Sequence, residues 1–103
     1  MRKKLIKILQ DLLDISDTEL EIYSFILNNS RVTVKDIVNN LKISKKTAHE
    51  KLKKLISLGL IDKKIDKKGY IYEAKADKYT ILSLLKKQLE KIYKEFEEEF
   101  SKL

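Results

Sequence analysis

The sequence predicts a mainly helical protein with one small β-hairpin past its middle. Apolar residues recur at helical spacing along most of the chain, and two β-prone runs flank a short loop that ends in glycine. Residues that cap helix starts recur at Ser16, Thr33 and Ser44. The 103 residues include no proline and two glycines, a composition that suits helices.

Four helices are expected before the hairpin. The first has leucines and isoleucines along one face, and capping boxes of Ser16 with Glu19 and of Thr33 with Asp36 start the second and third. Ser44 caps the fourth, and Gly59 suits the left-handed position that ends it. The expected ranges are 3–14, 17–27, 34–41 and 45–58. The buried face of the second helix is expected to be Leu20, Tyr23, Ile26 and Leu27.

A hairpin and a final long helix complete the predicted order. Residues 60–65 and 70–74 read as strands joined by a four-residue loop, 66–69. Tyr70 and Tyr72 share one strand face and are expected to cover the core. The last helix runs from about Asp77 to the end of the chain.

A short helix, a three-residue turn, a lysine-rich helix and a hairpin follow one another in the order of a winged helix-turn-helix. The length suits one domain over residues 1–103, with a winged-helix core at about 15–76 and a C-terminal dimerisation helix at about 77–103.

Positive charge is concentrated in the second half of this fold. Residues 42–68 hold ten lysines against three acidic residues, a net +7 that equals the net charge of the whole chain. This clustering favours a nucleic acid partner. Lys46, Thr47 and Glu50 are expected to reach base edges, and the hairpin lysines to contact phosphates. The candidate DNA-binding residues are Ser44, Lys45, Lys46, Thr47, His49, Glu50, Lys53, Lys54, Lys63, Lys64, Lys67 and Lys68, with His49 only at the flank.

The last helix carries an apolar stripe with alternating spacings of three and four residues. A mean spacing of about 3.5 is typical of helices that pair with another helix, so a homodimer is expected. The candidate dimer-interface residues are Leu5, Ile8, Leu9, Leu12, Leu82, Leu85, Leu89, Ile92, Phe96 and Phe100.

The chain from Val32 to Gly59, with Leu55-Ile-Ser-Leu-Gly-Leu-Ile61, the hairpin and Gly69-Tyr-Ile-Tyr-Glu-Ala74, resembles winged-helix regulators of the MarR and TrmB type in their short, stand-alone archaeal form. This resemblance implies a two-fold dimer that places two recognition helices in successive major grooves of an operator. It also implies that the N-terminal helix, 3–14, joins the dimer interface. Glu50 departs from the basic or polar residue common there, and is expected to pair with Lys46 and Lys54. Larger TrmB-type members carry a sugar-binding domain, for which 103 residues leave no room, so an effector remains an open question.

Other function classes are disfavoured. The sequence has no cysteine, one histidine, no phosphate-binding glycine loop and no nucleophile elbow, so neither catalysis nor a metal or cofactor is expected.

No membrane-spanning run or signal peptide is visible, and the cytoplasm is the expected location. Membrane contact through Lys3, Lys4 and Lys7 is a weaker alternative. The main alternative is a winged-helix module that docks on another protein in a transcription or chromatin assembly, against which the lysine clustering argues.

Overall fold

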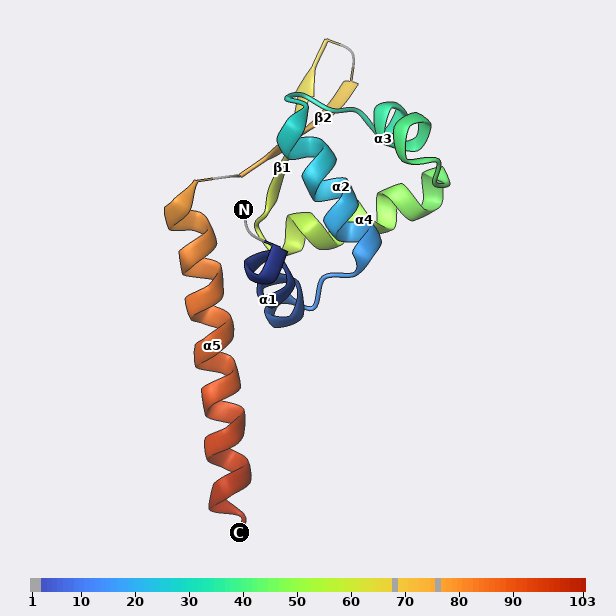
Figure 1. Cartoon of the computed structure of the whole chain (residues 1–103). Coiled ribbons are helices and arrows are strands. Elements are labelled where there is room, and N and C mark those ends of the chain that lie inside the picture. The colour runs from blue at the N-terminus through green and yellow to red at the C-terminus, as the bar shows by residue number, and fades with distance from the viewer. Residues whose placement is uncertain (1–2, 68, 76) are drawn as a thin grey trace.

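The computed structural model describes residues 3–67, 69–75 and 77–103, without the side chains of Leu5 and Lys78. Within these ranges, five helices and a two-stranded antiparallel sheet follow in the predicted order (Figure 1). The elements are α1 Lys3–Leu13, α2 Asp17–Asn28, α3 Val34–Leu41, α4 Lys45–Ser57, β1 Ile61–Asp66, β2 Gly69–Ala74 and α5 Lys78–Ser101.

The capping residues confirm the predicted starts of α2, α3 and α4. The Ser16 hydroxyl accepts the Glu19 N–H at 3.1 Å, and the Glu19 carboxylate accepts the Ser16 N–H at 2.8 Å. Thr33 and Asp36 form the same reciprocal pair at the start of α3. These bonds satisfy amide groups that a helix leaves unpaired at its first turn. The second helix ends at Asn28, one residue later than predicted.

Helices α3 and α4 form the helix-turn-helix. Lys42 ends α3 in the left-handed region, with a φ of 54°, and its N–H donates to the Val38 carbonyl at 3.0 Å. Ser44 then caps α4, so the chain changes direction between the two helices within three residues. Because of this turn, α4 packs against both α2 and α3.

The core lies where α2, α3, α4 and the base of the hairpin meet. Its most enclosed side chains are Ile22, Ile26, Val32, Ile37, Leu52, Leu55, Leu60 and Ile61. Two expectations for α2 were wrong: Leu27 is 43% exposed, and Ile22, which the sequence analysis omitted, is fully buried. The buried face of α2 is centred on Glu19, Ile22, Tyr23 and Ile26, which rotates Leu27 toward solvent.

The hairpin is tighter than predicted and gains a third partner. Its strands pair from Ile61 with Ala74 to Asp66 with Gly69, so the pairing includes two residues that were predicted to lie in the loop. On the other edge of β2, Val32 exchanges two backbone hydrogen bonds with Tyr72, of 3.0 and 2.7 Å. Tyr72 is buried as expected, whereas the expectation for Tyr70 was wrong, because that side chain lies farther out on the hairpin and is 54% exposed.

Two contacts define how the hairpin leads into α5. The Tyr23 hydroxyl donates to the Lys75 carbonyl at 2.9 Å, which holds the end of β2 against α2. Asp77 caps α5 by accepting the Thr80 N–H at 2.8 Å. The first turns of α5 pack on the core and on α1, and the rest projects away from the body (Figure 1). Three packed helices followed by a two-stranded wing form a winged helix-turn-helix, as the sequence predicted.

Candidate nucleic-acid interface

Ser44 and Thr47 organise the start of the candidate recognition helix, α4. The Ser44 hydroxyl oxygen accepts the Thr47 N–H at 3.0 Å, and the same hydroxyl donates to Thr47 Oγ1 at 2.9 Å. Thr47 is half-buried, while Ser44 is exposed. These two residues therefore fix the first turn of α4, and the next residues along the helix present their longer side chains beyond it.

The outward face of α4 has the residues that the helical spacing predicted. Lys46, Glu50, Lys53 and Ser57 are all exposed, as are Lys45 and His49 beside them. Among the described residues, Lys45, Lys46 and Lys53 form no ion pair. The outward face and its edge therefore carry three lysine charges that pair with no carboxylate in the described part of the chain.

The expected pairing of Glu50 was wrong. Within the described residues Glu50 forms no ion pair, and Lys54 pairs instead with Glu19, with Lys54 Nζ 3.2 Å from Glu19 Oε1. Lys54 also donates to the Asp14 carbonyl oxygen, between α1 and α2. The side chain of Lys54 is thus directed toward the α1–α2 junction, although the sequence analysis placed it among the DNA-binding residues.

Glu19 is a buried carboxylate that holds α4 in place. It is 3% exposed and lies between the Ser16 N–H and two lysines of α4, with Lys51 Nζ at 3.4 Å from Oε2 and Lys54 on the other oxygen. Burial would raise the pKa of Glu19, but the Ser16 N–H and the two lysines outweigh it and hold this pKa below its usual value. Sequence reasoning recognised Glu19 only as part of a capping box.

The wing holds further lysines on its two faces. Lys63 Nζ lies 4.0 Å from the centre of the Tyr70 ring, a cation–π contact, and Lys64 on the opposite face pairs with Glu73 at 2.9 Å. The hydrogen bond and the charge of Glu73 raise the pKa of Lys64. Lys67 is exposed at the tip, and the predicted contact residue Lys68 lies outside the described residues.

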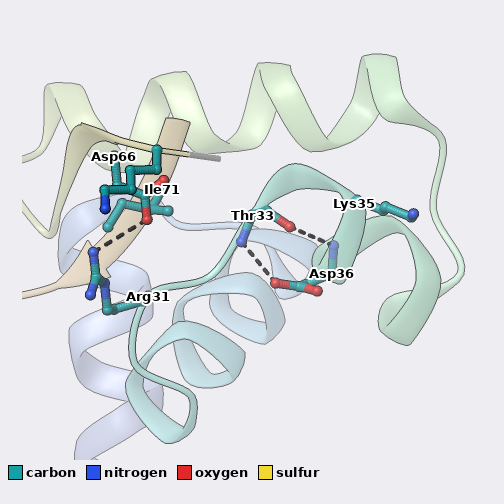
Figure 2. A pocket seen from close by; sticks show the side chains of 7 residues that line it. Arg31, Thr33, Lys35, Asp36, Asp66 and Ile71 are labelled. Atoms are coloured by element: carbon teal, nitrogen blue, oxygen red, sulfur yellow. Dashed lines mark hydrogen bonds and ion pairs between the residues drawn. The ribbon is translucent and has the colours of Figure 1, made fainter. Parts of the chain in front are cut away.

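A groove between the wing and α3 was not foreseen (Figure 2). It is open, has a volume of about 1040 Å³, and is lined by Arg31, Thr33, Lys35, Asp36, Asp66, Lys67 and Ile71. Figure 2 shows Arg31 reaching Asp66, at 3.2 Å, and Lys35 pointing away from that pair. Arg31 thereby ties the segment before α3 to the wing. An arginine directly after the Asn28-Asn29-Ser30 turn was the available signal.

The expected dimer residues fall into two groups. Leu9 is buried in the core of this chain, Leu12, Leu85 and Ile92 are half-buried, and the side chain of Leu5 is outside the described residues. The others are exposed, namely Ile8, Leu82, Leu89, Phe96 and Phe100. On α5 the exposed members continue past the point where the helix leaves the body (Figure 1).

Two other kinds of feature are absent from the described residues. No helix in the described ranges is both long enough and apolar enough to cross a bilayer. Across those same ranges, no three His, Cys, Asp or Glu side chains are grouped as metal ligands would be.

A winged helix with unpaired lysines on the helix after its turn belongs to a class of proteins that bind DNA. Residues 9–94 match the family model described as sugar-specific transcriptional regulator TrmB. Because the match spans most of the 103 residues, the chain belongs to the TrmB family. It is a DNA-binding transcriptional regulator and not an enzyme.

Solved structures agree with this fold. A possible transcriptional regulator from Methanosarcina mazei Go1 is 18% identical with a TM-score of 0.75, over 96% of this chain and 88% of that chain. A protein from the thermoacidophilic archaeon Sulfolobus tokodaii is 25% identical with a TM-score of 0.70, over 94% and 96%. A MarR protein from Peptoclostridium difficile is 24% identical with a TM-score of 0.63, over 95% and 64%. No curated protein sequence is significantly similar to the chain.

Proposed function

We propose that this chain acts as a homodimer that recognises a specific double-stranded DNA sequence and so regulates transcription. Each subunit would place the start of α4 in a major groove and its wing on the adjacent backbone. The proposed place of action is the cytoplasm of an archaeon, where the genome is directly accessible. The absence of cysteine from the sequence is compatible with that reducing compartment.

The division of lysines on α4 carries this proposal. Glu19 forms ion pairs with both Lys51 and Lys54 on the side of α4 that faces the protein. Lys45, Lys46 and Lys53 are exposed and have no ion-pair partner within the described residues. A phosphate backbone supplies the missing negative charge, and it releases bound counterions when lysines approach it.

In this proposal, the side chains that recognise DNA bases lie on the first two turns of α4. Lys46 and Glu50 are exposed there, one turn apart on the same face. In a major groove, lysine donates to guanine, and a carboxylate accepts from the amino group of cytosine. Thr47, which is half-buried, would present its methyl group to thymine, and His49 would lie at the flank. Ser44 and Lys45 would contact phosphates at the helix start.

The wing would add affinity with little sequence preference. Lys63 and Lys67 are exposed, and Lys64 is held near Glu73 by an ion pair. Long cationic side chains at a wing tip can reach phosphates or the minor groove. Lys68 is included in this proposal from the sequence alone.

The homodimer is supported by apolar surface that the described fold leaves uncovered. Leu89 and Phe96 of α5 are 52% and 59% exposed on a helix that projects from the body. Ile8 of α1 is also exposed, and α1 packs against α5. Contiguous apolar side chains of this kind favour association with a second subunit.

Selection from a pool of random duplexes tests sequence recognition directly. Wild-type protein is expected to enrich a two-fold symmetric site whose halves lie about 10 bp apart, or a multiple of that distance. Lys46→Ala is expected to enrich a degenerate site, whereas Lys51→Ala, which changes a lysine on the protein-facing side of α4, should enrich the wild-type site. Retention of DNA without enrichment of any sequence would contradict the proposed specificity.

A further inference from the structure

Arg31 adopts a backbone conformation that is uncommon for residues other than glycine and asparagine. Its φ is 62°, in the left-handed region. Two other non-glycine residues share this region within the described ranges, Asp14 and Lys42, and each directly follows the last residue of a helix, where the conformation is common. Arg31 follows no helix end directly. Its strained backbone therefore points to a role for its side chain.

The side chain of Arg31 extends to the outer end of the wing. Its Nη2 atom lies 3.2 Å from Asp66 Oδ2, as Figure 2 shows. Asp66 is the last residue of β1, and it precedes Lys67 at the wing tip. The ion pair thus joins the segment before α3 to the part of the wing that lies farthest from the core.

Backbone pairing attaches the wing to the body only near its base. Val32 bonds to Tyr72, and toward the tip β1 and β2 pair only with each other within the described residues. Ile65 is 75% exposed there, so the core does not cover the outer wing. A two-stranded ribbon is marginally stable by itself. The contact of Arg31 with Asp66 is therefore placed to fix the angle of this outer part.

We propose that Arg31 is a positioning residue for DNA binding, which acts through Asp66. It holds the wing at the angle at which Lys63 and Lys67 reach the duplex while α4 occupies the major groove. This inference rests on the proposed DNA-binding function and adds the residue that sets the position of the wing. A wing that is already ordered loses less conformational entropy when DNA binds, so the pair raises affinity without itself touching DNA.

Substitutions that change the charge in opposite directions test this role. Asp66→Asn removes a negative charge, so charge alone would tighten DNA binding, whereas loss of the wing position predicts binding about fivefold weaker. Arg31→Asn should weaken binding by a similar factor. Its unfolding midpoint should equal or exceed that of wild type, because asparagine tolerates the left-handed region. The exchanged double variant, Arg31→Asp with Asp66→Arg, should recover most of the affinity in fluorescence anisotropy.

Asp62→Asn is the matched control. Asp62 lies on the same strand but at the base of the wing, where it pairs with Lys75 at 3.2 Å. The substitution removes the same charge as Asp66→Asn, far from the tip, and should not weaken DNA binding. If Asp66→Asn bound DNA as tightly as wild type or more tightly, the positioning role would be overturned, because charge alone would then explain the result.

Backbone mobility in the absence of DNA separates failure of this role from failure of the proposed function. In ¹⁵N relaxation measurements, Arg31→Asn should lower the order parameters of residues 63–67 from about 0.85 toward about 0.6. Those of Val32 and Tyr72 should keep their wild-type values. Unchanged order parameters at residues 63–67 would overturn the positioning role alone. Wild-type protein with a rigid wing and no affinity for DNA would overturn the proposed function, and with it this role.

Discussion

Replacing the buried carboxylate of Glu19 with an amide should destabilise the fold measurably. Glutamine preserves the capping geometry at Ser16 but removes the charge that Lys51 and Lys54 share. Breaking a buried ion pair costs about 3–5 kcal/mol. Both lysine side chains are roughly one-third exposed and can turn to water, so we expect Glu19→Gln to cost about 1–2 kcal/mol.

Thermal and urea unfolding at equal protomer concentration measure this loss. For a chain of this size the midpoint temperature should fall by about 5–15 °C. Glu21→Gln is the matched control, because Glu21 is exposed on the same helix and should change stability by less than about 0.5 kcal/mol. Wild-type stability in Glu19→Gln at pH 7 would refute the role given to this carboxylate.

The difference in stability between wild type and Glu19→Gln should depend on pH. The pKa of Glu19 is lower in the folded chain than its ordinary value of 4.5. Its charge therefore stabilises the fold above pH 4.5, and this contribution is lost as the pH falls through the lowered pKa. The stability difference between wild type and Glu19→Gln should shrink below about pH 4. A difference that is constant from pH 7 to pH 3 would contradict the ion-pair explanation.

Further substitutions test the DNA interface, the dimer and the core. Lys46→Ala should lower affinity for the selected sequence by about 1–3 kcal/mol and reduce discrimination in competition binding. Lys67→Ala should weaken binding to all duplexes by a similar factor. It should also reduce, by about 0.9, the slope of the logarithm of the association constant against the logarithm of salt concentration. Leu89→Glu should yield monomer in sedimentation equilibrium, because dimerisation would bury an unpaired carboxylate. Ile22→Ala should cost about 2–5 kcal/mol in urea unfolding, because it opens a cavity in the core, whereas Leu27→Ala should cost much less.

Several results would contradict those expectations. If Lys46→Ala and Lys67→Ala lowered the affinity for every duplex equally, the proposal that Lys46 recognises bases and Lys67 contacts the backbone would be contradicted. Dimeric Leu89→Glu would move the subunit interface away from α5. Equal losses from Ile22→Ala and Leu27→Ala would contradict the rotation of α2 seen in the fold.

Helix starts were predictable because their determinants are local. Ser16 and Thr33 each act on an amide three residues ahead, so the pattern in the sequence is also the interaction in the structure. The left-handed conformation of Gly59, with a φ of 79°, follows from the same short-range reasoning. These signals were sufficient to give the element order and the winged-helix fold.

Partners that are distant in sequence were not predictable in this way. A helical projection gives the angle of Lys54 around α4 but not the neighbour on each side, so the contact with Glu19 was missed. Val32 pairs with Tyr72 across forty residues, and this pairing sets which part of β2 is enclosed. Alternation along the strand therefore placed Tyr72 correctly and Tyr70 incorrectly.

The salt dependence of DNA binding tests the central claim most directly. Fluorescence anisotropy with a labelled mixed-sequence duplex should show binding at low salt, and the logarithm of the association constant should fall linearly with the logarithm of salt concentration. Several lysine–phosphate contacts predict a slope of several units, at about 0.9 per contact. No binding even at low salt would contradict the account and would favour a winged-helix module that docks on another protein.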